Sequence, residues 1–205
     1  MRLLILGATG GIGRHLLKIG LGRGHSLTAY VRSPEKVAER HEALRVIKGD
    51  LFCPGTLARA IEGNDAVLSA FGPRTIRTTT LRRDFGRTLT AALTESGVTR
   101  VQLVSAAFLF ENAGGLGALL KPTLFRFMAP DMAAMERELM KEGLQWTVLR
   151  PPRLTSGPPT GAYRVADGAL PAGSSYAVSR ADVADFMIRE AEAPKWVRRV
   201  VGIAG

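Results

Sequence analysis

The amino-acid sequence predicts one α/β domain, residues 1–205, built on a doubly wound parallel sheet. Short apolar runs alternate with stretches that place apolar residues three or four positions apart, the pattern of strands separated by amphipathic helices. A glycine-rich turn follows the first apolar run directly. The chain is long enough to bury a sizeable core, and its 46% hydrophobic and 22% charged residues are ordinary for a globular domain.

The first half of the chain alternates between predicted strands and helices. We expect strands over residues 2–6, 26–32, 44–48 and 65–70, and helices over residues 12–21 and 56–61. A short helix is also expected after Ser33, which would be its N-cap, with Pro34 in the first turn, where a missing N–H does no harm. Strands joined through helices in this order pair in parallel through right-handed crossovers.

The second half continues the alternation up to residue 150. A helix over residues 80–96 ends at Gly97, and a later helix with Met132, Met135 and Leu139 on one face ends at Gly143. The remaining predicted elements are strands over 101–105, 146–149 and 197–203 and a helix over 180–191.

Two segments interrupt this pattern. Residues 151–179 are rich in proline and glycine, which prevents a long helix, and we expect them and residues 106–130 to form loops over one edge of the sheet. The next helix begins at a capping box, in which Ser179 is the N-cap and Asp182 the acidic partner.

Residues 7–13 have the sequence Gly-Ala-Thr-Gly-Gly-Ile-Gly, between a strand and a helix, which is typical of a Rossmann dinucleotide-binding loop. Gly7 permits the tight turn, Gly10 lets the backbone approach a pyrophosphate, and Gly13 lets the helix pack closely on the strand. The free N–H groups and positive dipole end of the helix would hold the phosphates. Cofactor binding is therefore assigned to Gly7, Ala8, Thr9, Gly10, Gly11, Ile12 and Gly13.

The end of the second strand predicts which dinucleotide binds. Enzymes that prefer NAD place Asp or Glu there, about 20 residues after the glycines, to hold the ribose 2′-hydroxyl. Arg32 stands at that position, and its guanidinium would pair with the 2′-phosphate of NADP(H), supported by Ser33 and Lys36. The alternative is an arginine that only caps the strand in water.

Two more loops are predicted to complete the cofactor site, because doubly wound folds bind ligands at the carboxyl ends of their strands. Asp50 and Leu51 follow the third strand, where Asp50 would accept a hydrogen bond from the adenine amino group. Ala70, Phe71 and Gly72 follow the fourth strand, where small residues would let the backbone approach the ribose.

With these motifs the chain resembles the atypical short-chain dehydrogenase/reductase family, and within it the NADPH-dependent flavin reductases, or biliverdin reductases B. The resemblance runs nearly end to end and rests on residues 7–10, 31–32, 49–50, 105–109, 150–152, 160–163 and 179–187. It implies a monomeric Rossmann domain that passes a hydride from NADPH to a flavin or another conjugated acceptor. It also adds Ser105, Pro151 and Pro152 to the cofactor site.

The chain departs from that family at two positions that bear on the acceptor. Members carry a serine where Ala106 stands, with Ser105 one residue earlier, and a histidine where Arg153 stands. These differences argue against biliverdin as the physiological substrate. Flavins, quinones and tetrapyrrole-like compounds stay open, and residues 106–130 and 151–179 would form the acceptor side. Phe108 and Phe110 are candidates for lining it, although core packing is the favoured interpretation.

The residue pattern also limits the chemistry. Typical short-chain dehydrogenases protonate an alkoxide with a Tyr and a Lys four residues apart, and the three tyrosines here are followed at that spacing by Pro34, Asp167 and Arg180. A conjugated acceptor needs no such donor, because its negative charge is delocalised and water can supply the proton. Ser105 and Arg153 are the catalytic candidates, the first to orient the nicotinamide or an acceptor carbonyl, the second to stabilise an anionic acceptor. A plain strand-end serine and a solvated loop arginine are the alternatives.

These residues leave three functions open. The first is an NADPH-dependent reductase of flavins, quinones or related acceptors. The second is a redox sensor that binds NADPH without turnover and regulates a protein partner, which the missing family serine and histidine and the missing Tyr/Lys pair favour. The third is a nucleotide-sugar epimerase or dehydratase, which the missing Tyr/Lys pair and the short C-terminal part argue against.

Composition bounds the partners and the location. The net charge of +10 would draw in small anionic ligands, and its scattered basic residues form no nucleic-acid-binding motif. No apolar run is long enough for a membrane span or a signal peptide, so we expect a soluble, cytoplasmic protein. The single Cys53 is expected to be buried in a reducing compartment, and the separated histidines predict no metal site, with His25 and His41 facing solvent.

Overall fold

An eight-stranded sheet forms the centre of the protein in this computed structural model, which describes residues 1–72, 79–110 and 128–205. The strand order is β3-β2-β1-β4-β5-β6-β10-β8, and neighbouring strands are parallel except for β10 and β8. The strands of this sheet are β1 (Arg2–Leu6), β2 (Ser26–Val31), β3 (Leu44–Lys48), β4 (Ala66–Ser69), β5 (Arg100–Val104), β6 (Gln145–Arg150), β8 (Arg164–Asp167) and β10 (Arg199–Ala204). A separate two-stranded parallel sheet pairs β7 (Arg153–Thr155) with β9 (Ala177–Ser179).

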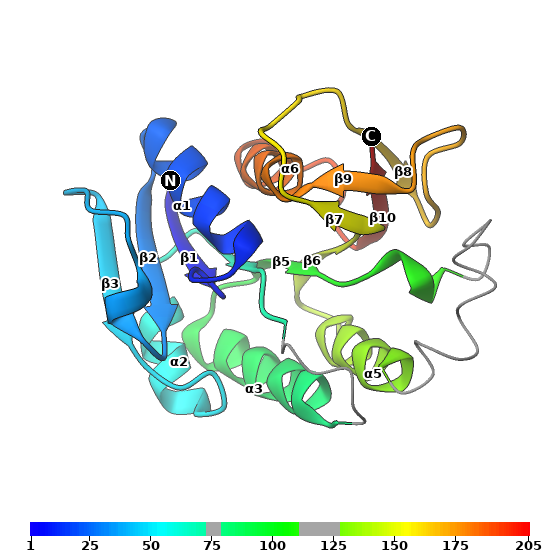
Figure 1. Ribbon diagram of the computed structural model, residues 1–205. Coiled ribbons are helices and arrows are strands. Elements are labelled where there is room, and N and C mark those ends of the chain that lie inside the picture. Colours follow the sequence, from blue (N-terminus) through cyan, green and yellow to red (C-terminus); the bar gives the residue numbers. More distant parts are fainter. Residues whose placement is uncertain (73–78, 111–127) are drawn as a thin grey trace.

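Helices cover both faces of the large sheet (Figure 1). On one face lie α1 (Gly11–Gly22) and α6 (Arg180–Glu192), and on the other lie α2 (Pro54–Ile61), α3 (Leu81–Ser96) and α5 (Ala129–Leu139). Two 3-10 turns, η1 (Pro34–Lys36) and η2 (Ala107–Leu109), complete the described elements. This is the predicted doubly wound Rossmann architecture.

The central strand β1 shows why the sheet is buried on both sides. Leu3 and Ile5 pack in the core cluster beneath α1 and α6, whereas Leu4 and Leu6 pack in the cluster beneath α2, α3 and α5. All four side chains are 0% exposed. A strand covered on both faces needs apolar residues at every position, which explains the uninterrupted apolar run at the start of the chain.

Most predicted elements lie within a few residues of the observed ones. The Met132, Met135 and Leu139 side chains are buried as expected, although α5 ends at Leu139 rather than at Gly143. Gly97 closes α3 in the left-handed conformation, with φ of +72°. Ser33 is the N-cap residue of η1 and Pro34 is its first residue, as predicted, although η1 is a single 3-10 turn and the Ser33 side chain makes no capping hydrogen bond.

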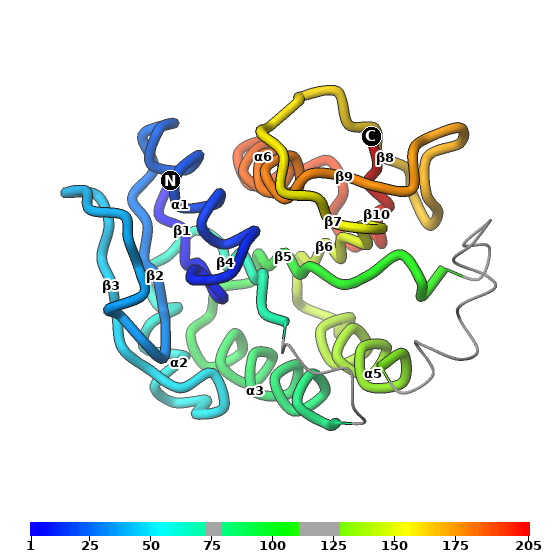
Figure 2. Tube along the Cα trace, in the orientation of Figure 1, coloured from blue at the N-terminus to red at the C-terminus, as the bar shows by residue number. Residues whose placement is uncertain are grey.

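The prediction of loops throughout residues 151–179 is also wrong in part, since β7, β8 and β9 lie there. The prolines do exclude a long helix, but these short strands pair with each other and with β10, which is far away in the sequence. In Figure 2 the trace of this segment, yellow to orange, lies beside α6 and the C-terminus. Of residues 106–130, η2 and the start of α5 are described, and residues 111–127 lie outside the described part.

Only one of the two hydrogen bonds of the predicted α6 capping box is present. The Ser179 hydroxyl accepts the Asp182 backbone N–H at 2.9 Å, as predicted. The Asp182 carboxylate binds the loop before β8 instead, where it accepts from Thr160 N–H at 2.7 Å and Gly161 N–H at 3.0 Å. Among the described residues, no helix is both long enough and apolar enough to cross a membrane.

Candidate cofactor site

The predicted site residues lie at the carboxyl ends of six adjacent strands, β3, β2, β1, β4, β5 and β6. The strand order reverses between β1 and β4, so the loops that leave these two strands separate toward opposite faces of the sheet. A crevice at such a switch point is where doubly wound folds bind their ligands.

The glycine loop has the tight geometry that its sequence predicts. Gly7 has φ of +77°, and a Cβ there would lie 2.7 Å from the carbonyl oxygen of Ala70 on the neighbouring strand end. The Gly10 N–H closes the turn on the Gly7 carbonyl at 2.9 Å. A Cβ on Gly13 would lie 2.6 Å from the Cα of Ala8. Larger residues at Gly7 and Gly13 would therefore force β1, α1 and the loop after β4 apart.

The N-terminus of α1 is free to bind an anion. Its N-cap is Gly10, which makes no side-chain capping bond, and the first turn holds no acidic residue. The first N–H groups of a helix have no partner within it, and together with the helix dipole they favour a phosphate. Ala8 and Thr9 lie in the loop before this helix, and Gly11 and Ile12 lie in its first turn.

Arg32 and Asp50 lie at neighbouring strand ends because β2 and β3 pair up to their last residues. The Gly49 N–H donates to the Val31 carbonyl at 3.0 Å, which places the two following residues at neighbouring strand ends. Arg32 is exposed and forms no ion pair within the described ranges. Asp50 is exposed too, and its Oδ1 accepts the Phe52 N–H at 3.0 Å, which leaves Oδ2 for a ligand. Ser33 is half-buried beside Arg32.

The loops after β3 and β4 supply an apolar wall. Leu51 and Phe71 are half-buried against the core, and the Phe71 ring lies 4.4 Å from that of Phe85. Phe52, 40% exposed, meets Phe71 edge to face at 6.2 Å. Ala70 is half-buried against Gly7, and Gly72 is exposed.

Ser105 is a buried polar group without a partner in the described structure. It is 8% exposed, and its hydroxyl makes no hydrogen bond to any described residue. Its N–H donates to the Leu149 carbonyl at 2.7 Å, and the Ala107 N–H donates to the buried Pro151 at 2.9 Å, so the ends of β5 and β6 are held together. A buried hydroxyl left unpaired is costly, and a ligand amide would satisfy it. This residue fits the nicotinamide end of a dinucleotide.

The residues predicted for the acceptor side differ in exposure. Arg153 is exposed at the start of β7, and Pro152 is half-buried beside it. Phe110 is 4% exposed and its ring lies 4.8 Å beneath the Arg150 guanidinium, which supports the core interpretation. Phe108 is half-buried against the cluster beneath α3.

Two tyrosine hydroxyls are held by protein partners. Tyr163 donates to Asp185 at 2.8 Å, and burial together with this carboxylate raises the pKa of the Tyr163 phenol. Tyr30 donates to the Asp50 carbonyl at 3.1 Å. Neither hydroxyl is placed as the proton donor of a typical short-chain dehydrogenase.

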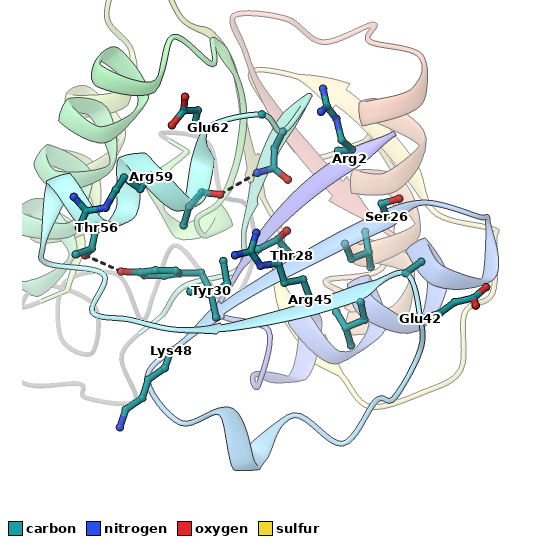
Figure 3. Close-up of a pocket in the computed structure, with 17 residues that line it drawn as sticks. Arg2, Ser26, Thr28, Tyr30, Glu42, Arg45, Lys48, Thr56, Arg59 and Glu62 are labelled. Carbon is teal, nitrogen blue, oxygen red and sulfur yellow. Dashed lines mark hydrogen bonds between the residues drawn. The ribbon is translucent and has the colours of Figure 1, made fainter.

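A groove of about 670 Å³ lies elsewhere, between β2, β3 and α2 (Figure 3). The figure shows Arg45 and Thr28 on the sheet surface, and Tyr30 bonded to Thr56 on the helix. The groove contains none of the predicted site residues.

Three side chains differ from expectation or were missed. Cys53 is exposed rather than buried, because it precedes the first turn of α2. His25 is 6% exposed and its Nε2 lies 2.8 Å from Glu192, so it does not face solvent. Arg180 lies against the glycine loop, although the sequence indicated only its place beside the capping box. Within the described ranges, no three His, Cys, Asp or Glu side chains gather as metal ligands.

The sequence matches the NAD(P)H-binding family over residues 7–194, nearly the whole chain. The chain belongs to the NAD(P)H-binding family. This match confirms that the chain is an NAD(P)H-binding domain. It leaves the choice between NAD and NADP open.

Two relatives match most of this NAD(P)H-binding chain. The uncharacterised protein YwnB of Bacillus subtilis is 31% identical over 95% of this chain and 94% of its own. An uncharacterised chloroplastic protein of Arabidopsis thaliana is 30% identical over 78% of this chain, which spans 61% of that protein.

Solved structures share the fold. A short-chain dehydrogenase/reductase from Veillonella parvula, solved in complex with NADP, superposes with a TM-score of 0.82 at 22% identity, covering 100% of this chain and 94% of that one. A candidate NADH-flavin reductase from Streptococcus pneumoniae superposes with a TM-score of 0.79 at 25% identity, covering 100% and 99%. The resemblance to short-chain dehydrogenases/reductases is thus confirmed at the level of the fold.

Proposed function

We propose that this protein is an NADP(H)-dependent reductase that transfers a hydride to a flavin, quinone or similar conjugated acceptor. The observation that carries the proposal is the exposed Arg32 guanidinium at the end of β2, without an ion pair to any described residue, beside the uncapped N-terminus of α1. Arg32 and the N-terminus of α1 would each bind one phosphate group of a dinucleotide, which would hold the cofactor at two points.

The preference for NADP(H) rests on the charge at Arg32. An acidic residue there would bond the ribose 2′-hydroxyl and repel a 2′-phosphate, whereas an exposed guanidinium can pair with that phosphate through two hydrogen bonds. The structure of the Veillonella parvula protein contains NADP, and this lends support from a protein of the same fold.

The proposed reductase activity rests on the residues that follow β5 and β6. When bound, the nicotinamide supplies or accepts a hydride at the ends of β5 and β6. The Ser105 hydroxyl would hold the carboxamide and so fix which ring face is presented. Pro151 and Pro152 would limit the ring's movement, and Arg153 would attract an anionic acceptor such as a flavin phosphate.

A conjugated acceptor suits the tyrosine arrangement. The Tyr163 hydroxyl is engaged with Asp185 and the Tyr30 hydroxyl with the Asp50 carbonyl. None of the three tyrosines is followed by a lysine four residues later, so reduction of a simple ketone lacks its usual donor pair. The name of the Streptococcus pneumoniae protein, a candidate NADH-flavin reductase, supports a flavin as the first acceptor to test. We further propose a cytoplasmic monomer that takes small-molecule substrates.

The same tyrosine arrangement favours one other function, a redox sensor that binds NADPH without turnover. NADPH oxidation, followed by absorbance with FMN, riboflavin and a quinone as separate acceptors, distinguishes the two. Turnover with any of them supports the reductase. Tight NADPH binding without turnover would replace it with the sensor. An epimerase or dehydratase is disfavoured because it usually needs the missing Tyr/Lys pair.

A further inference from the structure

The N-termini of α1 and α6 lie close together on the same face of the sheet, and an arginine fills the space between them. A Cβ on Gly11, the first residue of α1, would lie 2.5 Å from Cδ and 2.8 Å from Nε of Arg180. Arg180 is the first residue of α6. Its side chain therefore crosses directly over the start of the glycine-loop helix.

The charge of Arg180 has no carboxylate partner in the described parts of the chain. Its Nη1 donates to the Ser156 hydroxyl at 3.1 Å, which is a neutral acceptor. The nearby Asp182 carboxylate accepts from Thr160, Gly161 and the Ser179 hydroxyl. Arg180 also stands in the first turn of a helix, where the dipole disfavours a cation. The Arg180 guanidinium therefore lies between the positive ends of two helices with no negative group among the described residues to balance its charge, and a bound anion would supply that negative charge.

We propose that Arg180 binds the pyrophosphate of the dinucleotide, with Ser156 positioning its guanidinium. The proposal builds on the proposed cofactor function and divides the phosphates between two arginines. Arg32, at the end of β2, would contact the 2′-phosphate, whereas Arg180 would contact the group that lies over Gly11. In Rossmann folds the phosphates at this helix N-terminus are those of the pyrophosphate.

This division has a consequence that a purely structural arginine would not have. NAD and NADP share the pyrophosphate and differ in the 2′-phosphate. Loss of Arg180 should therefore weaken both dinucleotides by the same factor, while loss of Arg32 should weaken NADP alone. A mononucleotide that carries only the 2′-phosphate should be insensitive to Arg180.

The test is titration calorimetry of NADP⁺, NAD⁺ and adenosine 2′-monophosphate with the unmodified protein, Arg180→Gln and Arg32→Gln. We expect Arg180→Gln to raise the Kd of both dinucleotides about tenfold, as for a lost charge-assisted contact, and to leave the mononucleotide unchanged. Arg32→Gln should raise the Kd of NADP⁺ and the mononucleotide only. Arg137→Gln, an exposed arginine on α5, is the control for the loss of one charge.

Equal affinity of Arg180→Gln and the unmodified protein for both dinucleotides would overturn the proposal, even if the variant melted at a lower temperature. A loss confined to NADP⁺ would overturn it too, since Arg180 would then contact the 2′-phosphate. Arg180→Lys keeps the charge without the planar fork and should show a smaller loss on the same titrations. If the unmodified protein bound no dinucleotide at all, the proposed function itself would have failed, a result visible before any variant is compared.

Discussion

The Asp182 carboxylate accepts two hydrogen bonds from Thr160, one from its N–H at 2.7 Å and one from its hydroxyl at 2.9 Å. It also accepts from the Ser179 hydroxyl at 2.7 Å, and its side chain belongs to a residue that is only 2% exposed. One buried carboxylate therefore fastens the loop between β7 and β8 to the first turn of α6.

Asp182→Asn should lower the free energy of unfolding by about 2 kcal/mol, because an amide cannot accept all these hydrogen bonds and loses its charge. Urea unfolding measures this. Asp167→Asn is the control, since its ion pair with Arg199 at 3.2 Å is exposed and should contribute less than about 1 kcal/mol. Equal losses in the two variants would contradict this role for Asp182.

The stability of the protein should also depend on Asp182 in acid. Burial raises the pKa of this carboxyl, but hydrogen bonds from Ser179, Gly161 and Thr160 outweigh it and keep the pKa below its usual value. The native state therefore favours the ionised form more than the unfolded state does. Its contribution is complete above about pH 4, the unfolded value, and is lost as the pH falls toward the native pKa. The difference in unfolding free energy between the unmodified protein and Asp182→Asn should shrink over that interval.

Gly13→Ala should destabilise the fold by about 2–3 kcal/mol, because its Cβ would press on the Ala8 backbone, 2.6 Å away, which cannot move without separating α1 from β1. Gly22→Ala, in the last turn of the same helix, has nothing within 4 Å of its Cβ and should be neutral or stabilising. Thermal unfolding of both variants checks the contrast. Equal melting temperatures would show that the close helix–strand contact is not needed.

Ser105→Ala should leave the cofactor-free protein as stable as before or slightly more stable, because the buried hydroxyl has no hydrogen bond to lose among the described residues. Thr147→Val is the matched control. Its buried hydroxyl donates to the Trp196 carbonyl at 2.8 Å, so its loss should cost about 1–3 kcal/mol. If Ser105 holds the nicotinamide, Ser105→Ala should lower kcat/KM for NADPH. Unchanged kinetics would remove Ser105 from the site.

Arg32→Glu should raise the KM for NADPH at least tenfold, about 1.4 kcal/mol, because a carboxylate would repel the 2′-phosphate. The KM for NADH should stay level or fall. Arg59→Glu reverses the charge of an exposed arginine on α2 and controls for the change in net charge. Equal NADPH and NADH kinetics in the unmodified protein would contradict the assignment of Arg32.

Cys53 should react readily with a thiol reagent in the native protein. The thiol is exposed before α2, and hydrogen bonds from the Thr56 side chain and backbone lower its pKa. A larger thiolate fraction at neutral pH raises the labelling rate. The pH midpoint of labelling should lie below that of the urea-unfolded chain, with Cys53→Ser as the blank. A midpoint above it would show that Thr56 has no such effect.

The sequence alone determined the features that depend on neighbours along the chain. The alternation of apolar runs, the turn at Gly7 and the cap at Ser179 follow from backbone geometry and periodicity within a few residues. For this reason the order of residues was enough to predict the Rossmann architecture and the position of Arg32 at a strand end.

Only the tertiary structure decided which distant residues meet. His25 bonds Glu192 across 167 positions, β8 pairs with β10, and Arg180 reaches Gly11 because α1 and α6 pack on one face of the sheet. Each of these three contacts depends on strand order and helix packing rather than on local sequence. Such contacts leave no periodic signal, because the free energy that forms them comes from partners brought together only when the whole sheet assembles.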